Sequence, residues 1–156
     1  MTAPYGIRVA RSEADRAACF AVRTEVFVVE QRVPESIEYD AYDAGAVHVL
    51  AVDRDGSPIG TGRLLHGAPA EAKTGSAGVG SLGRLAVLRS ARGTGVGAAL
   101  VRAIEAEAAR LGLTAVDLGA QVHALGFYEA LGYVAYGPEF EEAGIAHRAM
   151  RRTLTP

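Results

Sequence analysis

The chain has 156 residues, 49% of them hydrophobic, and a formal net charge of −2 at pH 7. This length and apolar fraction predict a single domain over residues 1–156 with one substantial core. The slightly acidic balance gives no long-range attraction to nucleic acid or to an anionic membrane, so neither is expected as a partner.

The sequence carries no targeting or membrane pattern and a single cysteine. No basic-then-apolar leader is present, and no apolar run approaches the roughly 18 residues of a membrane span, so we expect a cytoplasmic protein. Cys19 has no second cysteine to pair with. Its helical spacing with Val22, Val26 and Val29 predicts a buried face and a core thiol, not a nucleophile. No metal site is predicted.

The first part of the chain predicts a strand, a long helix and an acidic segment. Residues 7–10 suit a short strand. Ser12 and Asp15 form a capping-box-like start for a helix over about residues 12–31, which Pro34 ends. The acidic residues that follow form either a solvated loop or a negatively charged wall facing a cationic substrate; they are Glu35, Glu38, Asp40 and Asp43.

Two strands and a loop come next. Residues 47–52 and 59–65 predict strands, and Asp55-Gly56 between them is a strong hairpin signal. Residues 67–80 are rich in Gly, Ala and Ser without periodicity, which predicts a mobile surface loop. Whether this loop closes over a substrate is left open.

A glycine-rich turn between a strand and a helix is the most informative stretch. Residues 85–88 form an apolar run that predicts a buried strand, and apolar residues from Val96 onward recur at helical spacing. Between them lie Gly93, Gly95 and Gly97. Because glycines lack Cβ atoms and a helix N-terminus presents unpaired amides, this turn predicts a phosphate site.

Two familiar phosphate patterns fit this turn poorly. A P-loop needs Gly-Lys-Ser/Thr at its end, but two alanines follow Gly97. Gly93, Gly95 and Ala98 do match the dinucleotide pattern G-x-G-x-x-A, with Asp117 about 20 residues on. However, polar residues separate the strand from the first glycine, and too little chain follows Asp117 for a doubly wound domain.

The rest of the chain predicts further strands around a short helix. Residues 113–118 predict a strand beside residues 85–88, and residues 122–131 predict a helix. Residues 133–136 and 145–154 complete the sheet, with an acidic bend between them.

Several motifs resemble the GNAT superfamily of acetyl-CoA-dependent N-acetyltransferases. A third pattern at the turn, R-x-x-G-x-G starting at Arg92, resembles the superfamily's pyrophosphate site. Residues 127–133, F-Y-E-A-L-G-Y, resemble its F-Y-x-x-x-G-F/Y segment. The run VFVVEQRVP at residues 26–34, the acidic pattern E-x-D-x-x-D, and G-I-A-H at residues 144–147 are similar to the ElaA-like branch. The resemblance covers nearly the whole chain.

This resemblance implies an α/β fold with a mixed, mostly antiparallel central sheet of about six or seven strands and helices on both faces. It also implies an enzyme that moves an acetyl group from acetyl-CoA to an amine by direct attack in a ternary complex. In the family, the strand before the turn bulges and pairs its backbone with the pantetheine arm. The implied cofactor-binding residues are Leu85, Ala86, Val87, Arg92, Gly93, Thr94, Gly95, Val96, Gly97, Gln121, Ala124 and Phe127.

The catalytic assignments combine the resemblance with reference pKa values. Tyr128 is the predicted general acid, because a phenol with a pKa of about 10 is protonated at neutral pH and can donate to a departing thiolate. Glu30, at the end of the first helix, is the leading candidate for the general base. The other candidates are a water relay and the side chains of Glu38, Asp40, His48, His123 and His147. The substrate side is assigned to Glu38, Asp40, His123 and His147.

Two other functions and the identity of the acceptor are left open. A catalytically silent acyl-CoA-binding or sensor module would keep the same turn, and a nicotinamide-dependent enzyme is the third hypothesis. The acceptor is a small-molecule or protein amine, and exposed strands at the C-terminal end would suit a homodimer.

Overall fold

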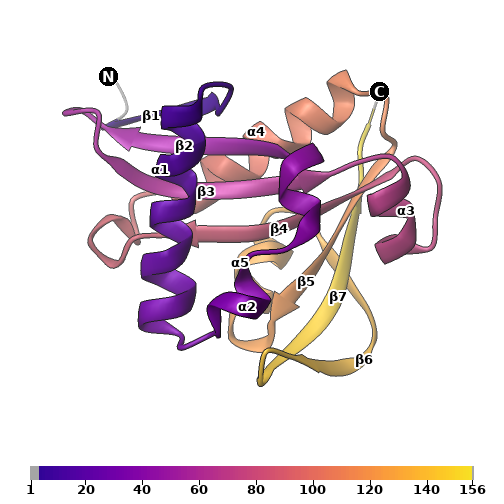
Figure 1. Cartoon of the computed structure of the whole chain (residues 1–156). Helices are drawn as coiled ribbons and strands as arrows, with labels where there is room; N and C mark the ends of the chain where they lie inside the picture. Colours follow the sequence, from indigo (N-terminus) through magenta and orange to yellow (C-terminus); the bar gives the residue numbers. More distant parts are fainter. Residues whose placement is uncertain (1–3, 156) are drawn as a thin grey trace. The chain divides into compact units, whose positions relative to one another are not determined.

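The computed structural model describes residues 4–155, which contain a seven-stranded mixed sheet in the order β1-β2-β3-β4-β5-β7-β6 (Figure 1). Two compact units divide the chain: unit 1 comprises the chain up to Leu64 together with Arg84–Ile104, and unit 2 comprises Leu65–Gly83 and the chain from Glu105 onward. Strand β4 (Val79–Val87) and helix α4 (Val96–Arg110) contribute residues to both units. The mixed, mostly antiparallel sheet with its helices confirms the predicted fold class.

In unit 1, three antiparallel strands form where the sequence predicts them. They are β1 (Tyr5–Val9), β2 (Val47–Asp53) and β3 (Pro58–Leu65). The β2–β3 turn contains Gly56 with a φ of 82°, a left-handed conformation that glycine adopts without steric cost. The Asp-Gly hairpin signal is therefore confirmed.

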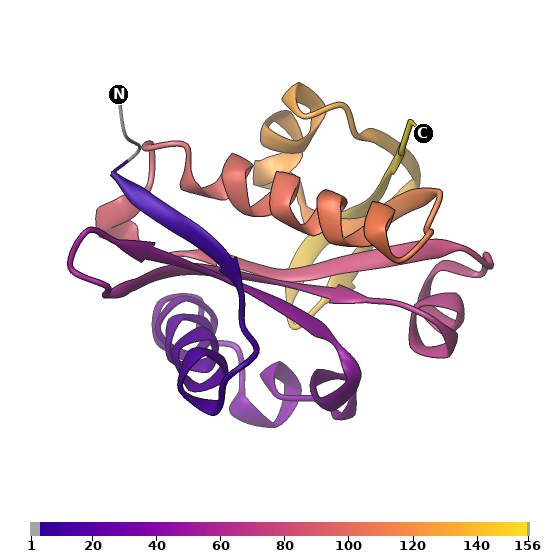
Figure 2. The same cartoon turned by 90° about the horizontal axis from the view of Figure 1, so that it is seen from above.

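Helices cover both faces of the sheet in unit 1 (Figure 2). On one face, Cys19 of α1 (Glu13–Arg23) packs with Leu50 and Val52 of β2. On the other face, α4 lies directly on the backbone of β3, and a Cβ atom added to Gly62 would come within 2.7 Å of Ile104 Cδ1. Small residues in β3 thus set how closely the first turns of α4 approach the sheet.

The first helix changes from an α-helix to a π-helix halfway along its length. α1 is capped by Ser12 Oγ, which accepts the Asp15 N–H, but it continues after Arg23 as the π-helix η1 (Thr24–Glu30). The wider π turn, closed by a bond from Gln31 N–H to Val26 O at 3.0 Å, rotates later side chains out of the 3.6-residue register. Val29 is consequently 60% exposed, so its assignment to the buried face is wrong.

Two segments expected to be irregular are helical instead. The acidic segment forms α2 (Glu35–Glu38) and the 3₁₀-helix η2 (Ala41–Gly45). In unit 2, the expected mobile loop contains α3 (Ala68–Thr74), which has a proline in its first turn and ends at Gly75 with a φ of 70°. The alanines of this segment, the proline at its start and the glycine at its end all favour a helix, and they outweigh the tendency of the surrounding glycines to form a loop.

The strands of unit 2 correct the predicted pairing. β5 (Ala115–Gln121) runs parallel to the first half of β4, with Val79 opposite Ala115 and Leu82 opposite Leu118, so pairing with residues 85–88 is wrong. The sequence does not predict a strand over residues 79–83, because this half of β4 contains glycine and serine, and such residues are uncommon in strands.

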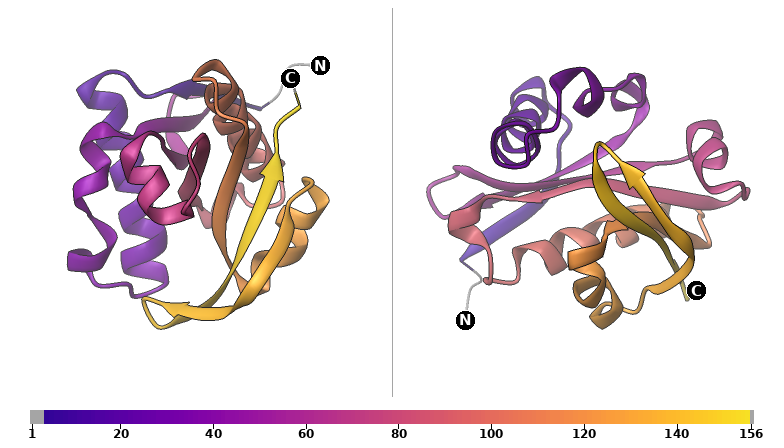
Figure 3. Two further views of the ribbon diagram at one scale, coloured as in Figure 1. Left: turned by 90° about the vertical axis from the view of Figure 1, so that its right-hand side faces the viewer. Right: turned by 90° about the horizontal axis from the view of Figure 1, so that it is seen from below.

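The end of the chain forms a long hairpin (Figure 3). β6 (Val134–Glu142) runs through the expected acidic bend, with a register shift between Tyr136 and Phe140, and pairs with β7 (Ile145–Thr153). β7 also pairs with β5. The 3₁₀-helix η4 (Val122–Ala124) and helix α5 (Leu125–Ala130) confirm the predicted short helix. Within residues 4–155, no helix is both long and apolar enough to cross a membrane.

Candidate functional site

An exposed glycine turn leads from β4 into α4. The 3₁₀-helix η3 (Arg89–Ala91) follows β4, and then Gly93 and Gly95 adopt left-handed φ values of 78° and 89°. The Ala99 N–H donates to Gly95 O at 3.0 Å, so α4 begins directly after the second glycine. The amides between Gly95 and Ala99 therefore have no acceptor within the helix, as at any helix N-terminus.

The space over this turn fits an anion. A Cβ atom on Gly93 would meet nothing within 4 Å, and one on Gly95 would meet only the Tyr5 hydroxyl, at 3.4 Å, among the described residues. The Thr94 hydroxyl donates to Ala91 O at 2.5 Å, which fixes the turn without filling it. Residues 93–97, here called the amide cradle, thus combine backbone donors, the positive end of a helix dipole and open space, the features that bind a diphosphate.

Arg92 holds the cradle in place through Glu30. Its guanidinium donates to both Glu30 carboxylate oxygens, at 2.8 and 2.7 Å, and its Nε donates to Val87 O at 3.0 Å. The side chain is thereby engaged with η1 and the end of β4. Hydrogen bonding to Arg92 lowers the pKa of the Glu30 carboxyl. A lowered pKa makes Glu30 a weaker proton acceptor, so this geometry argues against its predicted role as the general base.

A backbone distortion lies in β4 just before the predicted cofactor strand. Arg84 has a φ of 50°, in the left-handed region that non-glycine residues seldom adopt. Leu85, Ala86 and Val87 follow it, and the Leu88 N–H donates to Ile59 O at 2.9 Å. Such a distortion in a strand redirects the backbone beyond it, as a β-bulge does.

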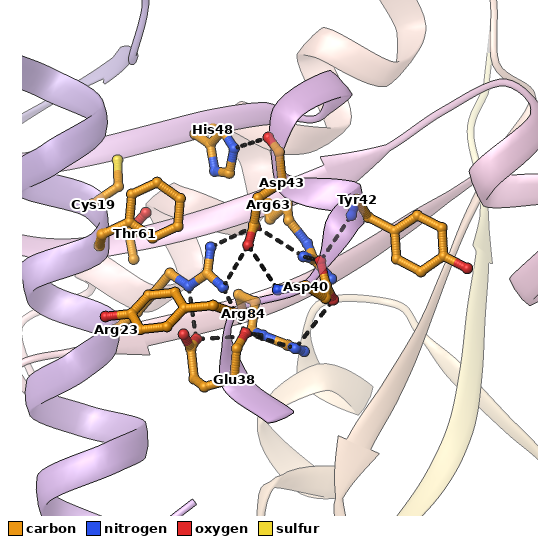
Figure 4. Close-up of polar contacts among 12 residues, drawn as sticks. Cys19, Arg23, Glu38, Asp40, Tyr42, Asp43, His48, Thr61, Arg63 and Arg84 are labelled. Carbon is orange, nitrogen blue, oxygen red and sulfur yellow. Dashed lines mark hydrogen bonds and ion pairs between the residues drawn. The ribbon is translucent and has the colours of Figure 1, made fainter. Parts of the chain in front are cut away.

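Six charged residues of unit 1 form the arginine–carboxylate cluster (Figure 4). It consists of Arg23, Arg63 and Arg84 with Glu38, Asp40 and Asp43. Arg23 contacts Glu38 Oε1 and Asp43 Oδ1, both at 2.7 Å. Arg63 contacts Asp40 Oδ1 at 2.7 Å and Asp43 Oδ1 at 2.9 Å. No local pattern in the sequence marks these arginines, because each lies in a separate element of the chain.

This cluster does not fit either interpretation of the acidic segment for Glu38, Asp40 and Asp43, whereas Glu35 is exposed, as a solvated residue would be. Glu38 is 1% exposed, so it belongs neither to a solvated loop nor to an exposed acidic wall. Burial alone would raise the pKa of the Asp43 carboxyl, but Arg23 and then Arg63 lower it to about 2. Asp40 also shares its carboxylate with Arg63 and Arg84. The carboxylates are matched by arginines within the chain, which removes the expected excess of negative charge.

His48 is enclosed beneath the same segment. It is 2% exposed, and its Nε2 hydrogen-bonds to Asp43 O at 2.9 Å, which assigns the ring proton to Nε2. Burial lowers the pKa of the imidazole, so the ring stays neutral. Its position in the core argues against its use as a general base for an incoming amine.

Tyr128 lies in α5 within an aromatic group of unit 2. It is 9% exposed, and its ring meets those of Phe127 and Tyr133 edge-on, at centroid distances of 4.9 and 6.0 Å. Burial raises the pKa of the phenol, so the hydroxyl is protonated at every physiological pH. Phe127 itself is 39% exposed and leaves an apolar face open beside Tyr128.

Four other predicted residues gather at the end of β5 and the start of β7. Gln121 Oε1 accepts from His123 Nε2 at 2.6 Å, and the β5–β7 register places Gln121 opposite His147. His147 donates from Nδ1 to Ile145 O at 2.7 Å and stacks on Phe140. Ala124 ends η4, half-buried between Gln121 and α5. Unit 2 therefore brings together two residues predicted to contact the cofactor, Gln121 and Ala124, and two predicted to face the substrate, His123 and His147.

Comparison with known proteins adds four likenesses. A family model described as an acetyltransferase (GNAT) domain matches residues 9–154. The chain is 37% identical over 145 residues to a Bacillus subtilis (strain 168) protein named as the uncharacterized N-acetyltransferase YjcF, covering 92% of this chain and 96% of that protein.

Two solved structures resemble the chain over most of its length. One, titled an acyl-CoA N-acyltransferase from Pseudomonas aeruginosa, is 33% identical with a TM-score of 0.79, covering 97% of this chain and 99% of that one. The other, Escherichia coli ElaA, is 26% identical with a TM-score of 0.78, covering 95% and 97%.

Proposed function

Because the chain belongs to the GNAT acetyltransferase family, we propose that it transfers an acetyl group from acetyl-CoA to the amine of an acceptor. The family and the fold indicate acyl transfer from an acyl-CoA. Acetyl as the acyl group and direct attack by the amine in a ternary complex are the finer parts of the proposal. The acceptor is a small-molecule or protein amine.

The observation that carries this proposal is the amide cradle. Its left-handed glycines and the start of α4 present backbone donors to open space, which suits the diphosphate of coenzyme A. Arg92 supports this role indirectly, because its bonds to Glu30 and Val87 brace the turn. The backbone at residues 85–87 is proposed to pair with the pantetheine arm and to polarise the thioester carbonyl through an amide.

The chemistry requires few groups from the protein. Acetyl-CoA supplies an activated thioester; the acceptor nitrogen bonds to the carbonyl carbon, the carbon–sulfur bond breaks, and the thiolate needs a proton. Tyr128 is proposed to donate that proton, since a tyrosine phenol is protonated at neutral pH. The amine loses a proton to water, and Glu30 is assigned to holding Arg92 instead of acting as the base.

The test is a thiol-release assay with acetyl-CoA and a panel of small amines and peptides. Turnover with any acceptor supports the enzyme, whereas tight acetyl-CoA binding without turnover across a wide panel supports the silent acyl-CoA-binding module. Thermal protection by acetyl-CoA but not by NAD would exclude the nicotinamide hypothesis, because only a ligand that binds the folded state raises the melting temperature.

Tyr128→Phe is expected to lower kcat by about 100-fold, the usual contribution of a positioned general acid. The dissociation constant for CoA should stay within about twofold, since the cradle is untouched. Tyr136→Phe is the matched control: Tyr136 is an exposed residue of β6 whose hydroxyl donates to Asp117 of β5, and the kcat of this variant should be unchanged. Steady-state kinetics and calorimetric CoA titration measure both quantities. Loss of CoA affinity with unchanged kcat would assign Tyr128 to packing alone.

A further inference from the structure

We propose that Arg84 is a positioning residue: it anchors the distorted backbone of β4 on the arginine–carboxylate cluster and so fixes the direction of residues 85–87. This inference rests on the proposed function, in which the backbone of those residues meets the pantetheine arm and the thioester. It adds a role for the cluster, which the proposed chemistry does not use. Figure 4 shows Arg84 together with Glu38 at the end of α2 and Asp40, the residue that caps the start of η2.

The backbone of Arg84 needs such an anchor. A φ of 50° is unfavourable for any residue with a Cβ atom, and it persists only where the surroundings hold it. Glycine would adopt this conformation without steric cost. The chain does have a glycine here, but it lies one residue earlier, at position 83. An arginine at the strained position therefore points to a requirement for its side chain.

That side chain reaches the backbone of another segment. Its Nε and NH2 both donate to Glu38 O, at 3.1 and 3.0 Å, and NH2 also lies 3.3 Å from Ile37 O. A further contact joins NH2 to Asp40 Oδ2 at 3.3 Å. The planar guanidinium thus spans the end of α2 and the following turn, a geometry that the single ammonium of lysine does not reproduce.

The segment that Arg84 grips is itself held rigidly. Arg23 contacts the Glu38 side chain at 2.7 Å and donates to Glu38 O at 2.9 Å. Asp43 joins Arg23 to Arg63, and Arg63 in turn contacts Asp40. Arg84 consequently ties β4 to a point that is fixed from α1 and β3 as well.

The cluster is poorly suited to stability alone. Buried ion pairs seldom stabilise a fold more than apolar residues of the same size, because the charges must leave water. Burial, and then repulsion by Arg63 and Arg23, lowers the pKa of the Arg84 guanidinium. Among the described residues, Glu38 Oε2, Arg63 Nε and His48 Nδ1 are buried without a hydrogen-bond partner. What the cluster does supply is a defined orientation of its donors.

The decisive variant is Arg84→Gly, which keeps the left-handed backbone accessible and removes the anchor. We expect kcat to fall by about 10- to 100-fold, the effect of a small misplacement of reacting groups. The CoA dissociation constant should stay within about twofold, because the amide cradle is unchanged. Arg54→Gly, in the exposed β2–β3 turn, is the matched control and should leave both quantities unchanged.

Hydrogen exchange of the backbone amides at residues 85–87 tests the anchor without any activity. In Arg84→Gly these amides should exchange at least about tenfold faster than in the parent protein, while amides of β1 and β2 keep their rates. This readout separates the two proposals: a parent protein without acyltransfer activity would overturn the proposed function, and the exchange rates would still report on Arg84.

Three results would overturn the role of Arg84. They are unchanged exchange at residues 85–87, an unchanged kcat in an active enzyme, and a fall in kcat matched by an equal loss of CoA affinity. If Arg84→Gly does not fold, Arg84→Gln, which keeps a side chain with fewer donors, is measured in the same way. Arg84→Lys should recover only part of the lost kcat, because one ammonium cannot bridge the same carbonyl oxygens.

Discussion

Arg23→Met is expected to lower the free energy of unfolding by about 3–5 kcal/mol, the usual effect of removing one partner from a buried ion pair. Arg23 is 1% exposed and is the donor for both Glu38 and Asp43. Its guanidinium also lies 4.7 Å from the centre of the Phe20 ring. Without Arg23, the Glu38 carboxylate, which is 1% exposed, would lose the cation that now lies 2.7 Å from it. Urea denaturation followed by circular dichroism measures the change.

Arg8→Met provides the matched control for this prediction. Arg8 also forms two 2.9 Å bonds to a single carboxylate, that of Asp15, but its side chain is 52% exposed. Water replaces the lost contacts there, so the unfolding free energy should change little. Similar losses in the two variants would contradict the assignment of Arg23 to a buried, essential position in the cluster.

Gly93→Asp is expected to weaken CoA binding by at least about 100-fold, which corresponds to roughly 2.7 kcal/mol of binding free energy. A Cβ atom at Gly93 would enter the open space over the turn, and its carboxylate would repel a diphosphate there. Aspartate tolerates the left-handed φ of 78° better than most residues, so the fold should survive. Isothermal titration with CoA measures the loss.

Gly56→Asp is the control for the backbone effect of this change. Gly56 has a φ of 82°, and a Cβ atom added to it would, as at Gly93, meet nothing within 4 Å, but this glycine lies in the β2–β3 turn. The two substitutions therefore impose the same conformational cost, and only the one at Gly93 should alter CoA affinity. Equal CoA affinity in both variants would remove the cradle from the cofactor site.

Local patterns predicted the elements that frame the cradle. Glycines at alternate positions and helical spacing after Val96 depend on neighbours in the sequence, and α4 and its left-handed turn lie where those patterns indicate. The family resemblance drawn from residues 92–97 and 127–133 is confirmed by the matching domain and by the likeness to ElaA. The roles assigned to individual residues at these motifs stay predictions.

Long-range contacts explain what the sequence did not predict. The carboxylates of Glu38 and Asp43 look like a solvated acidic run until Arg23, which is 15 and 20 residues away, is placed beside them. Likewise, the 3.6-residue spacing that assigned Val29 to the core holds only if the helix stays an α-helix, and η1 does not. A long-range contact decided against the local pattern in the first case, and a change of helix type did so in the second.

The central claim is that the backbone amides of residues 93–97 bind the diphosphate of coenzyme A. An amide NMR titration of the full chain with CoA tests it most directly, because it reports each backbone N–H separately. The proposal predicts the largest saturable shifts at Gly93, Thr94, Gly95, Val96 and Gly97. Saturable binding that moves amides elsewhere and leaves these five unchanged would contradict it.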